Sequence, residues 1–422
     1  MTMAAVGRLG SLASPSPLGR LVSRLTRMVA CISTLPSTGS LLSAAYTPSL
    51  LVSLPSLEAN DRTMRERIAP SGVKLRPHAK AFKSSALARW LLARAGDETV
   101  GLCVQTVHEA EAMLSRGGVA NLLLTNELYG PNARRLAELA AAHPTATVGV
   151  LVDSVRGVQA LSDASVKAGA ALAAYVEVDA GQNRCGVRRE SEEVARVARE
   201  VRDAPALELG GLQVYHGGIQ HVRSSASRRA AVEAGPARAA RRAVELLHAE
   251  GLAPPVLTGG GTGTFMLDLS AGVLTEVQPG SYLFMDGDYG QNEDRLFEQS
   301  LFVHTTVISV DEATGKRVVD AGAKAMDLLC GAPTVARHHL GLGSTSTLDN
   351  LSEEIIANIT YKNGGDEHGI LGNVPPGALP AGSTLQLVPS HCDACVNLHS
   401  HLLGVRNGVV ETIFPLDARG FY

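Results

Sequence analysis

Strand-like and helix-like segments alternate along this chain from about residue 46 to about residue 295. Apolar runs rich in β-branched residues, such as residues 99–106 and 173–179, are separated by longer stretches rich in Ala, Arg and Glu. Units of roughly 25–40 residues with this alternation imply parallel strands joined by crossover helices. Seven or eight such units in about 250 residues predict an α/β fold, a (β/α)8 barrel of the TIM type, with an open doubly wound sheet as the second choice.

The pattern changes after about residue 295. Segments such as 301–310 and 408–417 are strand-like, with turns between them and no long helical run. We therefore predict two domains, a barrel over residues 46–295 and a mostly-β domain over residues 296–422. The first strand-like segment, residues 47–54, is assigned to the barrel region, with packing against the C-terminal domain as the alternative.

The start of the chain forms a separate compositional region. It contains no Asp or Glu before Glu58, and it carries Arg8, Arg20, Arg24 and Arg27 among many serines. A basic, Ser-rich and acid-free start is typical of an organellar transit peptide, and the arginines interrupt the apolar run that a secretory signal needs. We predict a disordered leader over residues 1–45 that directs the protein to a chloroplast or mitochondrion. The alternative is an unstructured tail without an address on a cytoplasmic protein.

Composition excludes several classes of protein. A net charge of −3 and an aromatic content of 4% provide neither the basic surface nor the stacking platforms of a nucleic-acid-binding protein. The chain lacks an uninterrupted apolar run of about 18 residues, so no membrane-spanning helix is predicted. Six cysteines in 422 residues are too sparse for a disulfide framework, and reduced thiols are expected.

The segment 73–80 (VKLRPHAK) has three basic residues at alternate positions. If the segment is a strand, Arg76, His78 and Lys80 share one face. A lysine beside other cations has a lowered pKa, which makes it a better nucleophile for forming a Schiff base. The alternative is a solvated basic edge strand.

Three consecutive glycines follow a strand-like segment in TGGGTGTF (258–265). The backbone N–H groups of such a loop can converge on an anion, and a single phosphate monoester suits it. The loop lacks the Lys-Ser/Thr of a Walker loop and the spacing of a dinucleotide fingerprint. A plain tight turn is the alternative.

Further polar residues follow predicted strands and should gather at the carboxyl end of the barrel. They are Lys80, Gln105, Arg184, Tyr215 and His216. In VEVDAGQNRCGV (176–187), two glycines permit a sharp turn that points Arg184 back over the barrel mouth. A structural ion pair of Arg184 with Asp179 is the alternative.

The segment PSHCDACVNLH (389–399) offers two metal sites. His391 and Asp393 lie on the same side if the segment is extended, and one imidazole with one carboxylate suits a catalytic divalent ion with open positions. Cys392 and Cys395 beside His391 suggest structural zinc, but a second ligand pair at zinc-finger spacing is missing. An ordinary buried histidine is the third reading.

Taken together, these motifs resemble the family of D-threonine aldolases and eukaryotic-type D-serine dehydratases over about residues 46–422. The motifs are RPHAKAFKS, VEVDAGQNRCGV, YHGGIQH (215–221), TGGGTGTF, TEVQPGSYLFMD (275–286), DEHG (366–369) and PSHCD. The resemblance implies an alanine-racemase-like fold, a barrel with a C-terminal β domain, in a homodimer.

The resemblance also implies roles for individual residues. Lys80 matches the lysine that holds pyridoxal 5′-phosphate as a Schiff base, and Arg184 matches an arginine near the cofactor ring and its phenolic oxygen. His391 and Asp393 match the metal pair. The residues that match the lining of the ring and the phosphate are Gln105, Tyr215, Gly260, Gly261 and Thr262.

The metal pair separates the two activities of this family. The resemblance implies His-x-Cys with zinc for D-serine dehydratases, and His-x-Asp with a harder ion for D-threonine aldolases. Asp393 stands two residues after His391, so we predict retro-aldol cleavage of D-threonine and related D-3-hydroxy amino acids to glycine and an aldehyde. Manganese is the preferred ion, with cobalt or magnesium as alternatives.

Several points of the reaction stay open from the sequence. The base for the hydroxyl proton is either His216 or a water on the ion. The second function is D-serine dehydratase, and the third is a non-catalytic cofactor-binding barrel. The third fits less well because such barrels lack the additional C-terminal domain and its metal pair.

Overall fold

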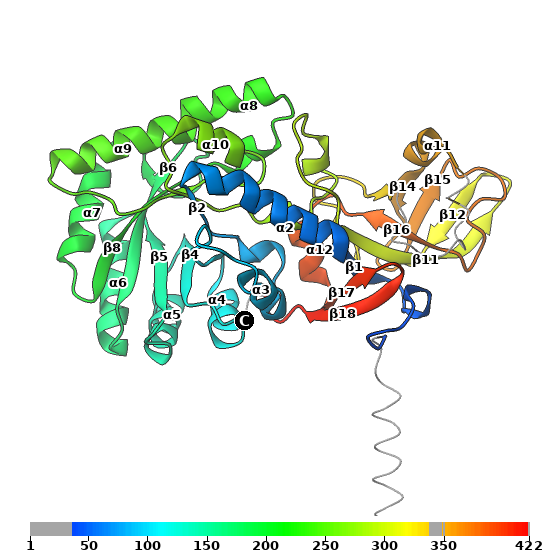
Figure 1. Cartoon of the computed structure of the whole chain (residues 1–422), viewed down its shortest axis with the longest axis horizontal. Helices are drawn as coiled ribbons and strands as arrows, with labels where there is room; N and C mark the ends of the chain where they lie inside the picture. The colour runs from blue at the N-terminus through cyan, green and yellow to red at the C-terminus, as the bar shows by residue number, and fades with distance from the viewer. Residues whose placement is uncertain (1–35, 337–347, 349–350, 421–422) are drawn as a thin grey trace, which may run out of the picture.

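The computed structural model describes residues 36–336, 348 and 351–420. The chain has two parts, a barrel surrounded by helices and a smaller β domain, and helix α2 (Leu54–Ile68) runs from one to the other (Figure 1). Within the described residues, none of the helices has the length and apolar character needed to cross a membrane.

The described residues form a barrel of eight strands, in which every neighbouring pair is parallel. The strands are β2 (Lys74–Leu75), β3 (Leu102–Val104), β4 (Asn121–Glu127), β5 (Thr147–Val152), β6 (Leu172–Asp179), β8 (Leu207–Tyr215), β9 (Leu257–Gly259) and β10 (Glu276–Val277). Backbone hydrogen bonds join the two ends of the sheet, from Val100 N–H to Leu75 O (3.0 Å) and from Cys103 N–H to Pro77 O (2.9 Å). The predicted parallel barrel is confirmed.

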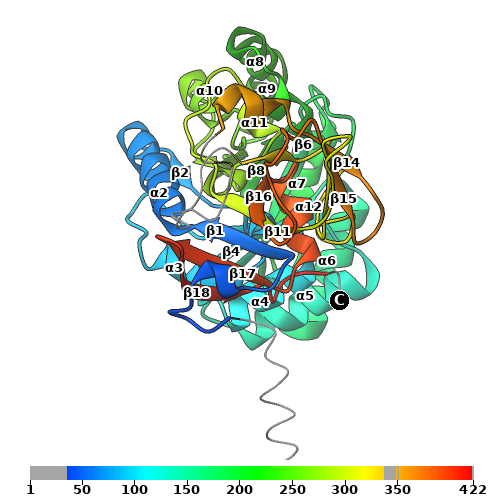
Figure 2. The same ribbon diagram turned by 90° about the vertical axis from the view of Figure 1, so that its right-hand side faces the viewer.

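Helices follow the barrel strands and cover their outer side (Figure 2). They are α3 (Ser85–Leu92), α4 (Val107–Ser115), α5 (Gly130–Ala142), α6 (Val155–Ala168), α7 (Glu193–Asp203), α8 (Ser225–Val232), α9 (Arg238–Ala249) and α10 (Phe265–Ala271). Local sequence sets their starts, because the Thr106 hydroxyl accepts the N–H of Glu109 and caps α4. In α7, Val194, Val197 and Val201 recur at helical spacing and are fully buried against the barrel.

Shorter elements complete the barrel region. A small strand β7 (Val187–Arg188) pairs with β6, and a π-helical turn η5 (Glu233–Ala237) joins α8 to α9. The single turns of 3-10 helix are η1 (Leu42–Ala44), η2 (Ala69–Ser71), η3 (Ala79–Ala81), η4 (Gly217–His221), η6 (Ser281–Leu283) and η7 (Tyr289–Gln291).

The C-terminal domain is mostly β, as predicted. Its strands are β11 (Leu301–Asp311), β12 (Lys316–Val319), β13 (Thr334–Val335), β14 (Thr360–Asn363), β15 (Gly369–Gly372), β16 (Thr384–Val388), β17 (His401–Arg406) and β18 (Val409–Pro415), with helices α11 (Glu353–Asn358) and α12 (Cys392–Leu398). The first strand, β1 (Ser49–Ser53), lies inside this sheet, antiparallel to β11 and parallel to β17. The described part of the chain therefore begins in the C-terminal domain, and α2 leads from there to the barrel.

Ordered structure begins before residue 46. The N–H of Gly39 donates to Val410 O, and the N–H of Leu42 donates to Gly408 O, each over 2.8 Å. Leu42 is fully buried in a cluster with Leu51 and Phe302. The predicted boundary of a disordered leader at residue 45 is therefore too late, because an acid-free composition cannot reveal that one of its leucines is buried. Residues 1–35 of that leader lie outside the described residues, and the targeting role stays a prediction.

Candidate active site

A small cavity opens at the carboxyl end of the barrel strands. It is lined by His78, Lys80, Gln105, Thr125, Arg184, Gln213, Tyr215 and Gln278. Four of these residues, Lys80, Gln105, Arg184 and Tyr215, are ones that the sequence placed after predicted strands. The structure brings them together because parallel strands present their carboxyl ends at one edge.

Arg76 lies below this cavity, inside the barrel. Its guanidinium donates two hydrogen bonds to Glu276, of 2.7 and 2.9 Å, and a third to Asn121 Oδ1. The prediction that Arg76, His78 and Lys80 share one strand face is wrong, because β2 ends at Leu75 and Lys80 lies in the turn η3. Arg76 is a structural residue whose charge Glu276 balances.

His78 is a neutral neighbour of Lys80 rather than a cation. Its Nε2 lies 3.0 Å from the Thr125 hydroxyl, and the ring is buried. Burial holds the pKa of His78 well below its ordinary value, and the charges of Lys80 and Lys83 lower it further.

Lys80 faces a carboxylate from the other domain. Its Nζ lies 4.0 Å from Asp393 Oδ2 and 6.0 Å from the ring centroid of Tyr215. Burial lowers the pKa of the Lys80 ammonium, but Tyr215 and Asp393 raise it, and the net shift is upward. The charge of Arg184 lowers this pKa, but the predicted net lowering is wrong, because Arg76 is paired and His78 is neutral.

Two other lysines near Lys80 in the sequence are already engaged. Lys83 is buried and forms an ion pair with Glu109, whose second oxygen accepts the N–H of Gln105 over 2.6 Å. Lys74 donates to the backbone oxygen of Asp97. Among the described residues, Lys80 is the one lysine that lines the cavity. The Lys83–Glu109 pair also fixes the backbone of Gln105, which sequence reasoning missed.

The loop after β6 places Arg184 beside Tyr215, with 5.7 Å between the guanidinium carbon and the ring centroid. The Asp179 carboxylate accepts the N–H groups of Gly181 and Asn183 and so shapes the turn. The alternative of an Asp179–Arg184 ion pair does not occur in the structure, where Asp179 binds backbone instead. Gly181 has a φ of 108°, a conformation that favours glycine.

Two carboxyl groups lie close together below Arg184. Burial raises the pKa of Glu177, on β6, and the neighbouring Glu127 at the end of β4 also raises it; the pKa reaches about 9. The positive charge of Arg184 lowers the pKa of Glu177, so the guanidinium lies close enough to act on this carboxyl group. Sequence reasoning missed this pair, because nothing local connects two glutamates on different strands.

Hydrogen bonds from buried side chains hold the glycine loop after β9 in place. The Thr264 hydroxyl accepts the N–H of Gly261 and donates to the buried carboxyl of Asp268. A Cβ on Gly260 would lie 2.4 Å from an Asp268 oxygen, and one on Gly261 would lie 2.7 Å from Gln220, so both positions need glycine. Thr262 uses its hydroxyl to accept the N–H of Tyr282. Phosphate binding by Gly260, Gly261 and Thr262 stays a prediction.

The segment that carries the predicted metal ligands begins a helix. The expectation of an extended segment is therefore wrong. α12 starts at Cys392, with His391 at its N-cap, and the N–H of Cys395 donates to His391 O. Burial lowers the pKa of His391, but the hydrogen bond to Asp286 and the charge of Asp393 raise it to about 9. His391 and Asp393 therefore still act on each other across the first turn of the helix.

The donor set fits a divalent ion. His391 directs Nδ1 toward Asp286, which leaves Nε2 available, and Asp393 offers a carboxylate beside Lys80. The donor atoms of Asp286, His391 and Cys392 lie within 4.8 Å of one another. Cys392 therefore points toward the cluster, contrary to the expectation for an extended segment, whereas Cys395 bonds weakly to Ala325 O. Metal binding by His391 and Asp393 stays a prediction.

His221, rather than His216, is the histidine of YHGGIQH that lies near this cluster. Its Nδ1 is 2.8 Å from Asp288 Oδ2, and its ring contacts Tyr289 with 4.5 Å between centroids. Burial lowers the pKa of His221, Asp288 and Asp286 raise it, and His391 lowers it. His216 instead packs near Gly181 and Gly235. The motif contained the signal for His221, but its spacing alone could not rank the two histidines.

Two family models match the chain, one for each part. The alanine racemase N-terminal domain matches residues 52–288, and the putative serine dehydratase domain matches residues 300–405. The two halves of the fold therefore correspond to two known domain families.

Curated relatives and a solved structure match nearly the whole chain. A D-threonine aldolase from Arthrobacter sp is 40% identical over 388 residues, which cover 91% of this chain and 95% of the relative. A 3-hydroxy-D-aspartate aldolase from Paracoccus denitrificans (strain Pd 1222) is 38% identical, with 90% and 93% covered. The crystal structure of D-threonine aldolase from Filomicrobium marinum superposes with a TM-score of 0.82 at 36% identity, over 91% of this chain and 98% of that one. The chain belongs to the alanine racemase N-terminal domain family and, within it, groups with the D-threonine aldolases.

Proposed function

We propose that the chain cleaves D-threonine and related D-3-hydroxy amino acids to glycine and an aldehyde. Pyridoxal 5′-phosphate on Lys80 and a divalent ion on His391 and Asp393 are part of this proposal, with manganese first and cobalt or magnesium as alternatives. One observation carries it: Lys80 Nζ lies 4.0 Å from Asp393 Oδ2. This distance supports a single site that combines the predicted cofactor lysine with the predicted metal ligand Asp393 from the other domain.

When bound, the cofactor supplies an electron sink for Cα, and the ion acidifies and orients the substrate hydroxyl. The side chains of this chain position the reactants around those groups. Lys80 presents its amine at the cavity, where Tyr215 and Arg184 flank it. Asp393 holds a carboxylate next to that amine, so a substrate whose amino group takes the place of the Lys80 amine would have its β-hydroxyl near the predicted metal ligands.

His221 is our candidate for the base that takes the hydroxyl proton. Its Nδ1 lies 2.8 Å from Asp288 Oδ2, and we assign the proton to this nitrogen, so that Nε2 is the proton acceptor. Burial lowers the pKa of His221 and so favours the neutral ring that a general base requires. His216, the candidate from the sequence, has no contact with Lys80, His391 or Asp393 among the interactions of the described residues. A water on the ion remains the competing base.

Dehydration of D-serine is the second candidate function. It uses the same parts, with Lys80 removing the Cα proton and the ion assisting departure of the hydroxyl. The match of the C-terminal domain to a serine dehydratase domain favours it. The hard oxygen ligand at Asp393 favours the aldol cleavage.

Purified protein loaded with cofactor and manganese tests the two functions directly. It is incubated with D-threonine and, separately, with D-serine, and acetaldehyde and pyruvate are measured. We expect acetaldehyde and glycine from D-threonine and little pyruvate from D-serine. Pyruvate as the dominant product would overturn the aldolase assignment.

We also propose a homodimer and an organellar location, as the family resemblance and the basic leader suggest. Light scattering during size-exclusion chromatography tests the dimer, and a monomeric mass would contradict it.

Import of residues 1–35 fused to a reporter tests the leader. A reporter that stays in the cytoplasm would contradict that prediction.

A further inference from the structure

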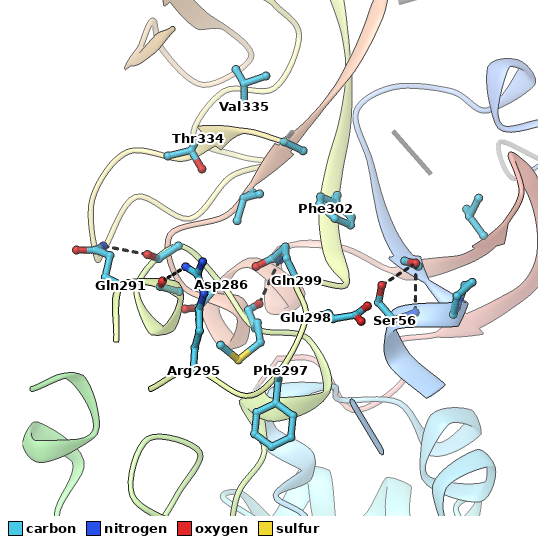
Figure 3. A pocket seen from close by; sticks show the side chains of 18 of the residues that line it. Ser56, Asp286, Gln291, Arg295, Phe297, Glu298, Gln299, Phe302, Thr334 and Val335 are labelled. Atoms are coloured by element: carbon cyan, nitrogen blue, oxygen red, sulfur yellow. Dashed lines mark hydrogen bonds between the residues drawn. The ribbon is translucent and has the colours of Figure 1, made fainter. Parts of the chain in front are cut away.

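Asp286 lies where the last loop of the barrel meets the start of α12. It borders the large groove between the two domains that Figure 3 shows, but its side chain is buried, with 1% of the residue exposed. It ends the motif TEVQPGSYLFMD, to which the proposed function gives no role. Its carboxylate contacts His391, one of the two predicted metal ligands, over 3.3 Å.

Three backbone N–H groups and one histidine ring nitrogen surround this carboxylate. Oδ1 accepts the backbone N–H of Asp288 (3.1 Å) and of Tyr289 (2.8 Å). Oδ2 accepts the backbone N–H of Cys392 (2.9 Å) and faces Nδ1 of His391. A carboxylate offers about four lone-pair positions, so this one is fully used by the protein.

Because all four positions of the carboxylate are occupied, we can choose between two roles for Asp286: binding the ion directly, or supporting the ligand His391. The donor atoms of Asp286, His391 and Cys392 are close enough together to hold an ion. An ion on Oδ2 would displace the N–H of Cys392, and an unpaired buried N–H costs about 1–3 kcal/mol. Asp286 is therefore better suited to support His391 than to bind the ion.

We infer that Asp286 is a positioning residue that orients His391, so that Nδ1 carries the proton and Nε2 faces the ion. The inference deepens the proposed function and rests on it. Ligand histidines commonly donate their second ring N–H to a carboxylate, which fixes the tautomer and the ring orientation. Here the same carboxylate also accepts the first N–H of α12, so one side chain sets both the ring and the helix that carries Asp393.

The backbone next to Asp286 supports this joint. The N–H of Gly287 donates to Pro389 O over 2.9 Å, and the N–H of Asp288 donates to Ser390 O over 3.2 Å. The residues after Asp286 therefore run beside the residues before His391. The side chain of Asp286 adds its own contacts, with Cys392 and His391, to these backbone hydrogen bonds between the barrel and the metal segment.

The test is Asp286→Asn in the full chain with its pyridoxal cofactor. The amide replaces one acceptor oxygen with an NH2 group, which faces N–H donors. We expect the dissociation constant for Mn2+ to rise about 10–100-fold. It is measured by competition against a chelating dye, while the absorbance of the bound cofactor stays unchanged. Excess Mn2+ should restore most of kcat, because the ligands themselves remain.

Asp320→Asn is the matched control. Asp320 is also a hydrogen-bonded carboxylate of the C-terminal domain, accepting from Thr305 and Thr47. We expect it to leave Mn2+ affinity unchanged. Equal Mn2+ affinity in wild type and Asp286→Asn would overturn the inference and leave the proposed function standing. A wild type that binds no Mn2+ would overturn the proposed metal site, and the inference with it.

A second measurement needs no variant. Nitrogen-15 NMR of histidine-labelled wild type with the diamagnetic ion Mg2+ reports the tautomer of His391. We expect a proton on Nδ1 and an unprotonated Nε2. In protein shown by dye competition to hold the ion, a proton on Nε2 would overturn the inference even if Asp286→Asn does not fold. A ring with protons on both nitrogens would mean that the ion is not bound, and would overturn the proposed metal site instead.

Discussion

The barrel side and the α12 side of the site are built in different ways. Tyr215 ends a parallel strand, and Lys80 and Gln105 follow two others, and barrel geometry brings such strand ends together. His391 and Asp393 sit at the start of a seven-residue helix in another domain, and one buried carboxylate, Asp286, holds that start in place. The barrel side therefore depends on the fold as a whole, whereas the metal side depends on a few specific hydrogen bonds. The first should tolerate local change, and the second should not.

Lys80→Ala should have the largest effect, because Lys80 is the one lysine among the described residues that lines the cavity. We expect loss of the cofactor's Schiff-base absorbance and of nearly all activity, on the order of 10³-fold or more. Absorbance spectra and acetaldehyde release measure this. Lys74→Ala is the control, since Lys74 binds Asp97 O. A Lys80→Ala protein that keeps the band would move the cofactor to Lys83.

Chelation and His391→Ala should separate the two sides of the site. We expect both to reduce cleavage by about 10²-fold or more while the cofactor stays bound, because the barrel side holds it without the ion. Added manganese should rescue the chelated enzyme but not His391→Ala.

Asp393→Cys should shift the preference toward zinc, since a thiolate is a softer ligand. Cys395→Ala should keep metal binding, and its failure to do so would favour the cysteine-based site.

Asp268→Asn examines a buried carboxyl on the barrel side. Burial raises the pKa of Asp268 to about 7, although the hydrogen bond from Thr264 lowers it. The native state therefore prefers the protonated carboxyl, and the stability from this group is lost as pH rises from about 4 to about 7. Asn mimics the protonated form. The free energy of unfolding of the variant should therefore rise relative to that of the wild type as pH rises through this range, by up to about 4 kcal/mol. Urea unfolding at pH 5 and pH 8 measures it; an equal difference at both pH values would contradict the prediction.

Truncation should have the smallest effect on activity. A chain starting at residue 36 should match the full chain in stability and cleavage. A chain starting at residue 46 also loses Leu42, whose burial contributes about 1.5–3 kcal/mol. Thermal unfolding of the two truncated chains gives the difference. Equal stability would show that residues 36–45 contribute nothing to the C-terminal domain.

The sequence was most informative where structure is periodic. Strand alternation predicted the barrel, and polar residues after strands predicted four of the residues that line the cavity. It failed where a contact joins distant residues. Arg76 is neutralised by Glu276 on the neighbouring strand β10, 200 residues later in the sequence, and no local pattern shows that pairing. The short helix after His391 was also missed, because its N-terminal turn depends on Asp286 from another segment.

The place of β1 has a consequence for how this chain is made. Leu50 pairs with Leu402, so the second strand neighbour of β1 is synthesised long after β1 and after the whole barrel. The barrel has every strand it needs before that point, whereas the sheet around β1 stays incomplete. During synthesis, β1 leaves one edge unpaired next to a finished barrel, and unpaired edges favour aggregation. The sheet around β1 is therefore completed, and α12 is added beside Lys80, only after all the barrel strands have been synthesised.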